Sequence, residues 1–127
     1  MRIGSEADAT VATLEAHRLF MDLGVRDVVA MKFRTAVSEL VRNILKYAGK
    51  GHVVLTPIRD GARVGMRAEV VDKGPGIADL ERALEDSYST GGTLGLGLPG
   101  VRRMVDRFEL QSAEGEGTRV TIEVWGS

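Results

Sequence analysis

The spacing of apolar residues in the first fifty positions predicts a short edge strand followed by two helices. Residues 1–5 fit the strand, and from residue 6 to 23 apolar side chains recur at a loose helical period until Gly24 offers a stop signal. From residue 27 to 48 the apolar stripe is tighter and fits a period of 3.6 residues. It comprises Phe33, Val37, Leu40, Val41, Ile44, Leu45 and Ala48. Both helices are therefore expected to bury one face.

The remaining pattern is dominated by strands that follow one another directly. Residues 64–72 alternate between apolar and polar, and Asp60-Gly61 before them is typical of a hairpin turn. The full set of expected elements is a strand over 53–58, a strand over 64–72, a short helix over 79–85, a helix over 98–107 and strands over 108–113 and 118–124. Paired hairpins favour an α+β, two-layer sandwich with a mixed, largely antiparallel sheet over a doubly wound parallel sheet.

Length and composition narrow the possible functions. A chain of 127 residues fits one domain, residues 1–127, and is too short for a two-lobed protein kinase or a complete dehydrogenase. The net charge of −1 and the 5% aromatic content argue against general nucleic-acid binding, and the absence of Cys excludes disulfides. Neither a signal peptide nor a membrane-spanning run is evident, so a cytoplasmic location is expected.

Sixteen glycines are the compositional exception, and many fall in two clusters. One is Asp72-Lys73-Gly74-Pro75-Gly76, and the other covers residues 91–100 and leads into a predicted helix. Glycine allows backbone to approach a ligand closely, and a helix N-terminus favours phosphate. The Gly/Ser/Thr-rich residues 86–97 are expected to act as a lid over a bound nucleotide. Residues 95–100 match GxGxxG, but no good strand precedes them, which disfavours a dinucleotide fold.

Four polar residues are candidates for chemistry. Glu39 and Asn43 lie four residues apart and therefore share one face of the second helix, with Lys46 on the same side. An amide oxygen suits Mg²⁺, a carboxylate can accept a proton from an attacking hydroxyl, and Lys can meet phosphate. Asp72, at a strand end, could accept a hydrogen bond from an adenine amine. Taken singly, each also fits a solvated helix face or an ordinary turn.

The order of these motifs resembles the GHKL superfamily of ATPases and kinases. Residues 39–47 resemble its N box, Asp72–Gly76 its first glycine box, Gly95–Leu98 its second, and Gly115–Thr118 its last. The likeness runs from about residue 30 to 125. Within the superfamily, residues 47–51, 89–92 and 97–101 look like the small bacterial serine kinases of the anti-sigma-factor type, which include the stressosome switch kinases.

The resemblance implies a Bergerat fold with ATP and Mg²⁺ between the helices and the lid. On the phosphate side, Asn43 would coordinate Mg²⁺, Glu39 would activate the acceptor hydroxyl, and Lys46 would contact phosphate. Gly95 and Gly97 would lie against the phosphates. No arginine for the transition-state charge is evident, and Arg42 or a partner's arginine are open candidates.

On the adenine side, the same resemblance assigns a binding role to four residues. Asp72 would bind the exocyclic amine, and Gly74 and Gly76 would let the backbone line the pocket. Thr118 would complete this side through a bridging water. His17 and His52 are instead expected at the surface or the edge of the core, because His17 has no ligand partner in the sequence and His52 reads the same way, and Trp125 is expected to pack in the core or at its edge.

The implied role is a serine/threonine protein kinase in a partner-switching pathway. Relatives of this type phosphorylate STAS-domain proteins similar to RsbS and RsbR and, once released, activate an RsbU-type phosphatase. The first two helices are the expected partner surface, and a weak homodimer stays open because anti-sigma relatives dimerise. No nucleic acid or membrane partner is expected.

Two other functions share the same nucleotide pocket. One is a nucleotide-binding anti-sigma factor or switch module that acts by protein binding without essential catalysis. The other is the catalytic fragment of a sensor histidine kinase, which the sequence disfavours because only about 25 residues precede the domain and His17 lacks an acidic context. Glu39 distinguishes kinase from binding module, since binding alone needs no carboxylate there.

Overall fold

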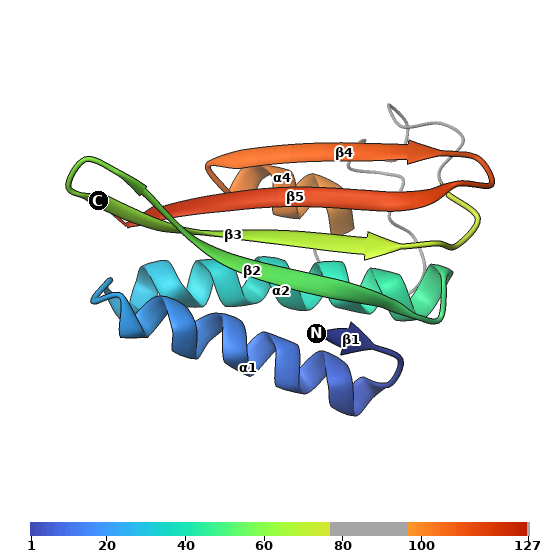
Figure 1. Ribbon diagram of the computed structural model, residues 1–127, viewed down its shortest axis with the longest axis horizontal. Helices are drawn as coiled ribbons and strands as arrows, with labels where there is room; N and C mark the ends of the chain where they lie inside the picture. Colours follow the sequence, from blue (N-terminus) through green and yellow to red (C-terminus); the bar gives the residue numbers. More distant parts are fainter. Residues whose placement is uncertain (77–96, 127) are drawn as a thin grey trace.

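The computed structural model describes residues 1–76 and 97–126, and these form helices on one side of a sheet (Figure 1). The described helices are α1 (Glu6–Asp22), α2 (Asp27–Tyr47) and α4 (Gly97–Met104). The strands are β1 (Arg2–Ile3), β2 (Gly51–Asp60), β3 (Arg63–Asp72), β4 (Arg107–Ala113) and β5 (Gly117–Gly126). The helix expected over 79–85 and all but the last residue of the lid expected over 86–97 lie outside the described residues.

The described strands form one five-stranded sheet in the order β1-β2-β3-β5-β4. Every described pair is antiparallel, including the central pair of β3 with β5, in which Asp72 lies opposite Thr118. The predicted α+β sandwich is confirmed, and the described part of its sheet is antiparallel rather than mixed. No helix within residues 1–76 or 97–126 is long and apolar enough to cross a membrane.

Most predicted boundaries agree with the structure to within one or two residues. The exception is α4, which ends at Met104 rather than at residue 107. The backbone N–H of Asp106 already donates to the carbonyl of Glu123 on β5 (2.9 Å), so the chain has joined the sheet by this point. Pairing across the sheet, invisible in a local pattern, therefore shortens the helix.

Local signals in the sequence explain the helix starts and turns. The Ser5 side chain accepts a hydrogen bond from the N–H of Asp8 (3.1 Å), which caps the first turn of α1. Gly24 ends that helix with a positive φ of 87°, and Gly61 provides a φ of 62° in the tight turn between β2 and β3. Both glycines thus act where the sequence predicted a stop or a turn.

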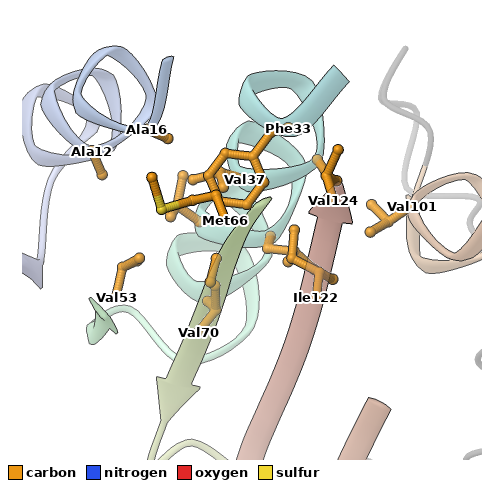
Figure 2. Close-up of a cluster of buried hydrophobic side chains, with 14 of the residues drawn as sticks. Ala12, Ala16, Phe33, Val37, Val53, Met66, Val70, Val101, Ile122 and Val124 are labelled. Atoms are coloured by element: carbon orange, nitrogen blue, oxygen red, sulfur yellow. The ribbon is translucent and has the colours of Figure 1, made fainter. Parts of the chain in front are cut away.

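The core lies between the helix layer and the inner face of the sheet, with α2 between α1 and α4 (Figure 2). Phe33 and Val37 of α2 point at Met66 of β3 and Val124 of β5, and Val101 of α4 closes one side (Figure 2). Phe33 is completely buried and meets Phe20 of α1 edge to face, with 5.5 Å between ring centroids. Phe33 therefore joins both long helices to the sheet.

Phe33→Ala is expected to lower the free energy of unfolding by about 3–5 kcal/mol, because a fully buried ring leaves a cavity that the core cannot refill. Phe33→Leu, which keeps most of the volume, should cost clearly less. Urea denaturation of both variants measures the difference. Equal stability of Phe33→Ala and the native chain would contradict this account of the core.

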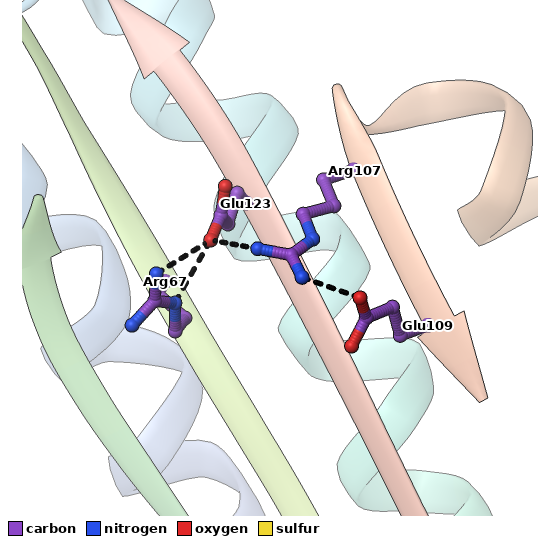
Figure 3. A network of polar contacts seen from close by, with 4 residues as sticks. All are labelled: Arg67, Arg107, Glu109 and Glu123. Carbon is purple, nitrogen blue, oxygen red and sulfur yellow. Dashed lines mark hydrogen bonds and ion pairs between the residues drawn. The ribbon is translucent and has the colours of Figure 1, made fainter. Parts of the chain in front are cut away.

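The outer face of the sheet carries a row of ionic side chains (Figure 3). Glu123 is only 6% exposed and bonds Arg67 on β3 (2.9 Å) and Arg107 on β4 (3.1 Å), and Arg107 also pairs with Glu109. The hydrogen bond to Glu109, with the charges of Glu109 and Glu123, raises the pKa of the Arg107 guanidinium. The network links three adjacent strands on the face of the sheet opposite the described helices.

His17 and Trp125 have the packing roles expected from the sequence. His17 lies between the long helices, with Nε2 3.0 Å from Oδ1 of Asp27 and Nδ1 3.2 Å from a guanidinium nitrogen of Arg34. The Trp125 ring lies against Gly65, where an added Cβ would come within 2.8 Å of the ring, and the Arg63 guanidinium covers it at 4.6 Å.

Candidate functional site

The C-terminal end of α2 meets the end of β3 at the first glycine box. A Cβ added to Gly74 would lie 2.6 Å from the Cβ of Ala48, the residue that caps α2. A Cβ added to Gly51, which pairs with Asp72, would likewise lie 3.1 Å from the Ile44 side chain. Gly74 therefore allows the N box and the first glycine box to come together.

The first glycine box also packs on the turn between β4 and β5. The N–H of Gly115 donates to the carbonyl of Pro75 (2.6 Å). Gly76 has a φ of 76°, and an added Cβ would lie 2.0 Å from the carbonyl oxygen of Ala113. Gly117 has a φ of 86° and would meet the carbonyl of Asp72 at 2.2 Å. Backbone contacts of this kind exclude any side chain at Gly76 and Gly117.

Three polar side chains form a row across this end of the sheet. Asp72 of β3 lies opposite Thr118 of β5, which lies opposite Ser112 of β4. All three share the helix side of the sheet, because each lies two residues from an inward-facing apolar residue: Val70, Val120 and Leu110. The row is half-buried. Polar groups thus replace the apolar core at this end.

The carboxylate of Asp72 is held by its own turn. Its Oδ1 accepts a hydrogen bond from the N–H of Gly74 (2.9 Å). Within the described part of the chain, no partner bonds Oδ2. One oxygen therefore orients the carboxylate, and the other remains available to a ligand.

A hollow of about 570 Å³ opens at the same end of the sheet, and its lining includes Asp72, Ser112 and Thr118. It also reaches the outer face through His52 and Arg119. This volume lies in the range of small-molecule sites. The polar row is therefore accessible from solvent.

The catalytic candidates lie on α2, one to three turns before its end. Asn43 and Glu39 precede Ala48 by about 7 and 13 Å along the axis, at 1.5 Å per residue. Asn43 lies nine residues from Arg34, about half a turn round the helix, and Arg34 contacts α1 through His17. Asn43 therefore faces away from α1, toward the side of α2 where α4 packs (Figure 2). Neither Glu39 nor Asn43 bonds a described side chain.

Three predicted site residues remain, Lys46, Gly95 and Gly97, and the structure describes two of them. Lys46 is exposed, with its ammonium 5.1 Å from the centre of the Tyr47 ring, so the structure does not bring it to the row of Asp72. Gly97 begins α4 with a φ of 66°. Gly95 lies outside the described residues.

The donor set suits a magnesium ion held jointly with a nucleotide. Between residues 1–76 and 97–126 there is no cluster of three or more His, Asp or Glu side chains able to hold a metal alone. Mg²⁺ typically uses one or two protein oxygens together with phosphates and waters. The half-buried, uncommitted amide of Asn43 fits such a single ligand.

Comparison with known proteins identifies the class. Residues 28–126 match the family of histidine kinase-, DNA gyrase B- and HSP90-like ATPases, and the chain belongs to this family. The predicted GHKL resemblance is thereby confirmed.

Two individual proteins illustrate which members of the family this chain is similar to. The chain is 41% identical over 125 residues to the serine/threonine-protein kinase RsbT of Bacillus subtilis (strain 168), a match that covers 98% of this chain and 94% of that protein. It is 30% identical over 106 residues to an anti-sigma F factor of Caldanaerobacter subterraneus subsp. tengcongensis, covering 80% and 73%. The expected likeness to small serine kinases of the anti-sigma-factor type is confirmed.

Sequence reasoning missed two contributors to the site, Ser112 and Ala48. Ser112 bonds Thr118 across the hairpin, and Ala48 is the surface on which Gly74 packs. A signal for Ser112 existed: the turn at Gly115–Gly117 sets the register that places residue 112 opposite 118. The contact of Ala48 with Gly74 joins segments 26 residues apart and has no local signature.

Proposed function

We propose that this protein is a serine/threonine protein kinase that binds Mg·ATP at the row formed by Asp72 and Thr118. The observation that carries the proposal is the convergence of three motifs. The Asp72 turn, the β4–β5 turn and the end of α2 meet through Gly74, Gly76 and Gly117, and the helix above carries two uncommitted polar side chains. The 41% identity with a serine/threonine-protein kinase over nearly the whole chain supports the same reading.

In this proposal, the turn at residues 72–76 recognises adenine. The free Oδ2 of Asp72 accepts a hydrogen bond from the exocyclic amine, while Gly74 holds the carboxylate in place. Gly74 and Gly76 supply backbone beside the base, and Thr118 completes this side through a water. Gly95, and Gly97 at the start of α4, are assigned to the phosphates.

Phosphoryl transfer is assigned to α2. The acceptor hydroxyl oxygen forms a bond to the γ-phosphorus as the bond to the β–γ bridging oxygen breaks, and ADP leaves. Glu39 takes the hydroxyl proton. Mg²⁺, when bound, neutralises phosphate charge, and Asn43 supplies its protein ligand. Lys46 reaches phosphate only if its exposed side chain leaves the Tyr47 ring.

The proposed substrates are STAS-domain proteins of the RsbS and RsbR kind, and an RsbU-type phosphatase is the second partner. Similarity to both a serine/threonine-protein kinase and anti-sigma F factors supports a switch between protein partners. Exposed apolar side chains on the long helices, among them Val11, Leu14 and Val28, support the expectation that partners contact α1 and α2.

The test has two stages. Calorimetric titration with ATP and ADP, with and without Mg²⁺, measures nucleotide binding. Incubation of the chain with γ-labelled ATP and a purified STAS-domain protein then measures transfer, with phosphopeptide mapping of the acceptor residue. Saturable ATP binding together with label on a Ser or Thr supports the proposal, whereas absence of ATP binding both alone and with the STAS protein contradicts it.

Asn43→Ala is expected to remove most of the Mg²⁺ dependence of ATP binding, because the Asn43 amide oxygen is the proposed protein ligand of the ion. The affinity in Mg²⁺ should fall about tenfold toward the value in EDTA, while the EDTA value itself stays within about twofold. Calorimetry in both buffers measures this. Lys32→Ala, exposed on the same helix, is the control. Unchanged Mg²⁺ dependence in Asn43→Ala would remove it from the ligand role.

The second candidate is a nucleotide-binding switch module without essential catalysis. The similarity to anti-sigma F factors at 30% identity is the observation that favours it. Both candidates use the same nucleotide site, and they differ in whether Glu39 is required.

A further inference from the structure

Helix α1 carries apolar side chains on two opposite faces. Its inner face buries Ala9, Ala12, Ala16 and Phe20 in the core. A second stripe, with spacings of three and four residues, is exposed and comprises Ala7, Val11, Leu14, Arg18 and Met21. Val11 and Leu14 are 57% and 50% exposed. A helix that is apolar on both sides is typical of a buried helix, and this spacing is typical of a seam between helices.

The exposed side of α2 continues this surface. The two helices are antiparallel neighbours, and His17 of α1 lies 3.2 Å from Arg34 of α2 (Figure 1). Since these two residues are at the same height, Met21 is at the height of residue 30, next to the exposed side chains of Val28 and Met31. The outer helix face is defined here by its exposed apolar side chains, Val11, Leu14, Met21, Val28 and Met31.

The two helices of this face carry opposite charge. Four Asp or Glu residues and one Arg give α1 a net charge of −3, whereas four Lys or Arg and two Asp or Glu residues give α2 a net charge of +2. Asp8, Glu15 and Asp22 are seven residues apart and therefore share one flank of α1. Glu15 is two residues, or about 200°, from His17, which faces α2, so this acidic flank is remote from α2.

Lys32 is a matching cation on α2. It is two residues, or about 200°, from Arg34, which faces α1, so it lies on the flank of α2 remote from α1. It is exposed and pairs with no side chain within residues 1–76 and 97–126. Its height is that of residue 19, between Glu15 and Asp22. These two carboxylates share the single cation of Arg18, at 2.8 and 3.0 Å, which leaves one negative charge uncompensated.

We propose that the outer helix face is a self-complementary interface through which two copies of this chain associate, with α1 of each copy on α2 of the other. A two-fold axis parallel to the helices leaves every residue at its own height, so Lys32 of the second copy meets the acidic flank between Glu15 and Asp22. The antiparallel alternative, α1 on α1, would set the two acidic flanks against each other.

The size of the face indicates a reversible dimer. It is about 25 Å long and about 20 Å wide, which is less than the roughly 800 Å² per partner of a standard interface. The association does not involve the nucleotide hollow at the Asp72 end of the sheet, so it stands or falls independently of ATP binding. Because the proposed protein partners are expected on the same helices, they would displace the second copy, a consequence that rests on the proposed function.

Sedimentation equilibrium of the intact chain over a concentration series tests the interface. The native chain should show a monomer–dimer equilibrium. Leu14→Lys places a charge at the centre of the stripe and should raise the dissociation constant at least about tenfold. Because Leu14 is half exposed, this variant should fold. Val54→Lys, which changes a 46% exposed apolar side chain on the sheet, is the matched control and should dimerise like the native chain.

Charge reversal tests the arrangement of the two copies. Glu15→Lys and Lys32→Glu should each weaken association about three- to tenfold, and the double variant should return to within about threefold of the native constant. Single reversals without effect would overturn the placement of α1 on α2. A native chain that stays monomeric, or a dimer that Leu14→Lys leaves unchanged, overturns the interface. If the native chain is monomeric and only Leu14→Lys loses binding to a STAS-domain protein, the face belongs to that partner instead.

Discussion

Asp72→Asn is expected to weaken ATP binding by about ten- to a hundredfold, the loss of one charge-assisted hydrogen bond of about 1.5–3 kcal/mol. The substitution is nearly isosteric, and the Asn carbonyl oxygen can still accept from the N–H of Gly74. The amide nitrogen then takes the place of Oδ2 and presents a donor to the donor of adenine. ATP binding is therefore weakened while the turn is kept.

Calorimetric titration with ATP measures the effect, and thermal unfolding checks that the variant is folded. Asp60→Asn, an exposed Asp at the end of β2, is the matched control and should bind like the native chain. Native affinity in a folded Asp72→Asn would place the adenine somewhere other than the end of β3.

Glu39→Gln is expected to reduce phosphoryl transfer about 10²- to 10⁴-fold while ATP affinity stays within about threefold, because the amide cannot accept the hydroxyl proton. Since Glu39 bonds no described side chain and is half-buried on α2, the substitution leaves the surrounding contacts intact. A large loss in transfer without a loss in binding is the signature of a group used in the chemical step.

Single-turnover transfer of labelled phosphate to a STAS-domain protein measures the rate, with calorimetry for affinity. Asp60→Asn, exposed at the end of β2 rather than on α1 or α2, serves as the control. Normal transfer by Glu39→Gln would remove the catalytic role from this carboxylate. If the native chain binds ATP but shows no detectable transfer, the result favours the second candidate function, a nucleotide-binding switch module without essential catalysis.

Local patterns predicted the elements well where each element depends on its own residues. The apolar stripe of α2 is buried as expected, from Phe33 through Ile44, and Gly24 and Gly61 turn the chain with positive φ. The pattern failed at the end of α4, where pairing of Asp106 with Glu123 overrides helical propensity. It also could not foresee the ionic row at Glu123, which needs the register of three strands.

The sequence by itself determined the family and the candidate residues, because ordered glycine boxes and a polar pair at helical spacing are local features. Tertiary structure decided which of them meet. Gly74 packs against Ala48, Gly117 packs against Asp72, and Ser112 hydrogen-bonds Thr118, and each of these contacts joins segments that lie apart in the sequence. Which residues lie opposite each other depends on the register with the neighbouring strand, and no periodicity along one strand carries that information.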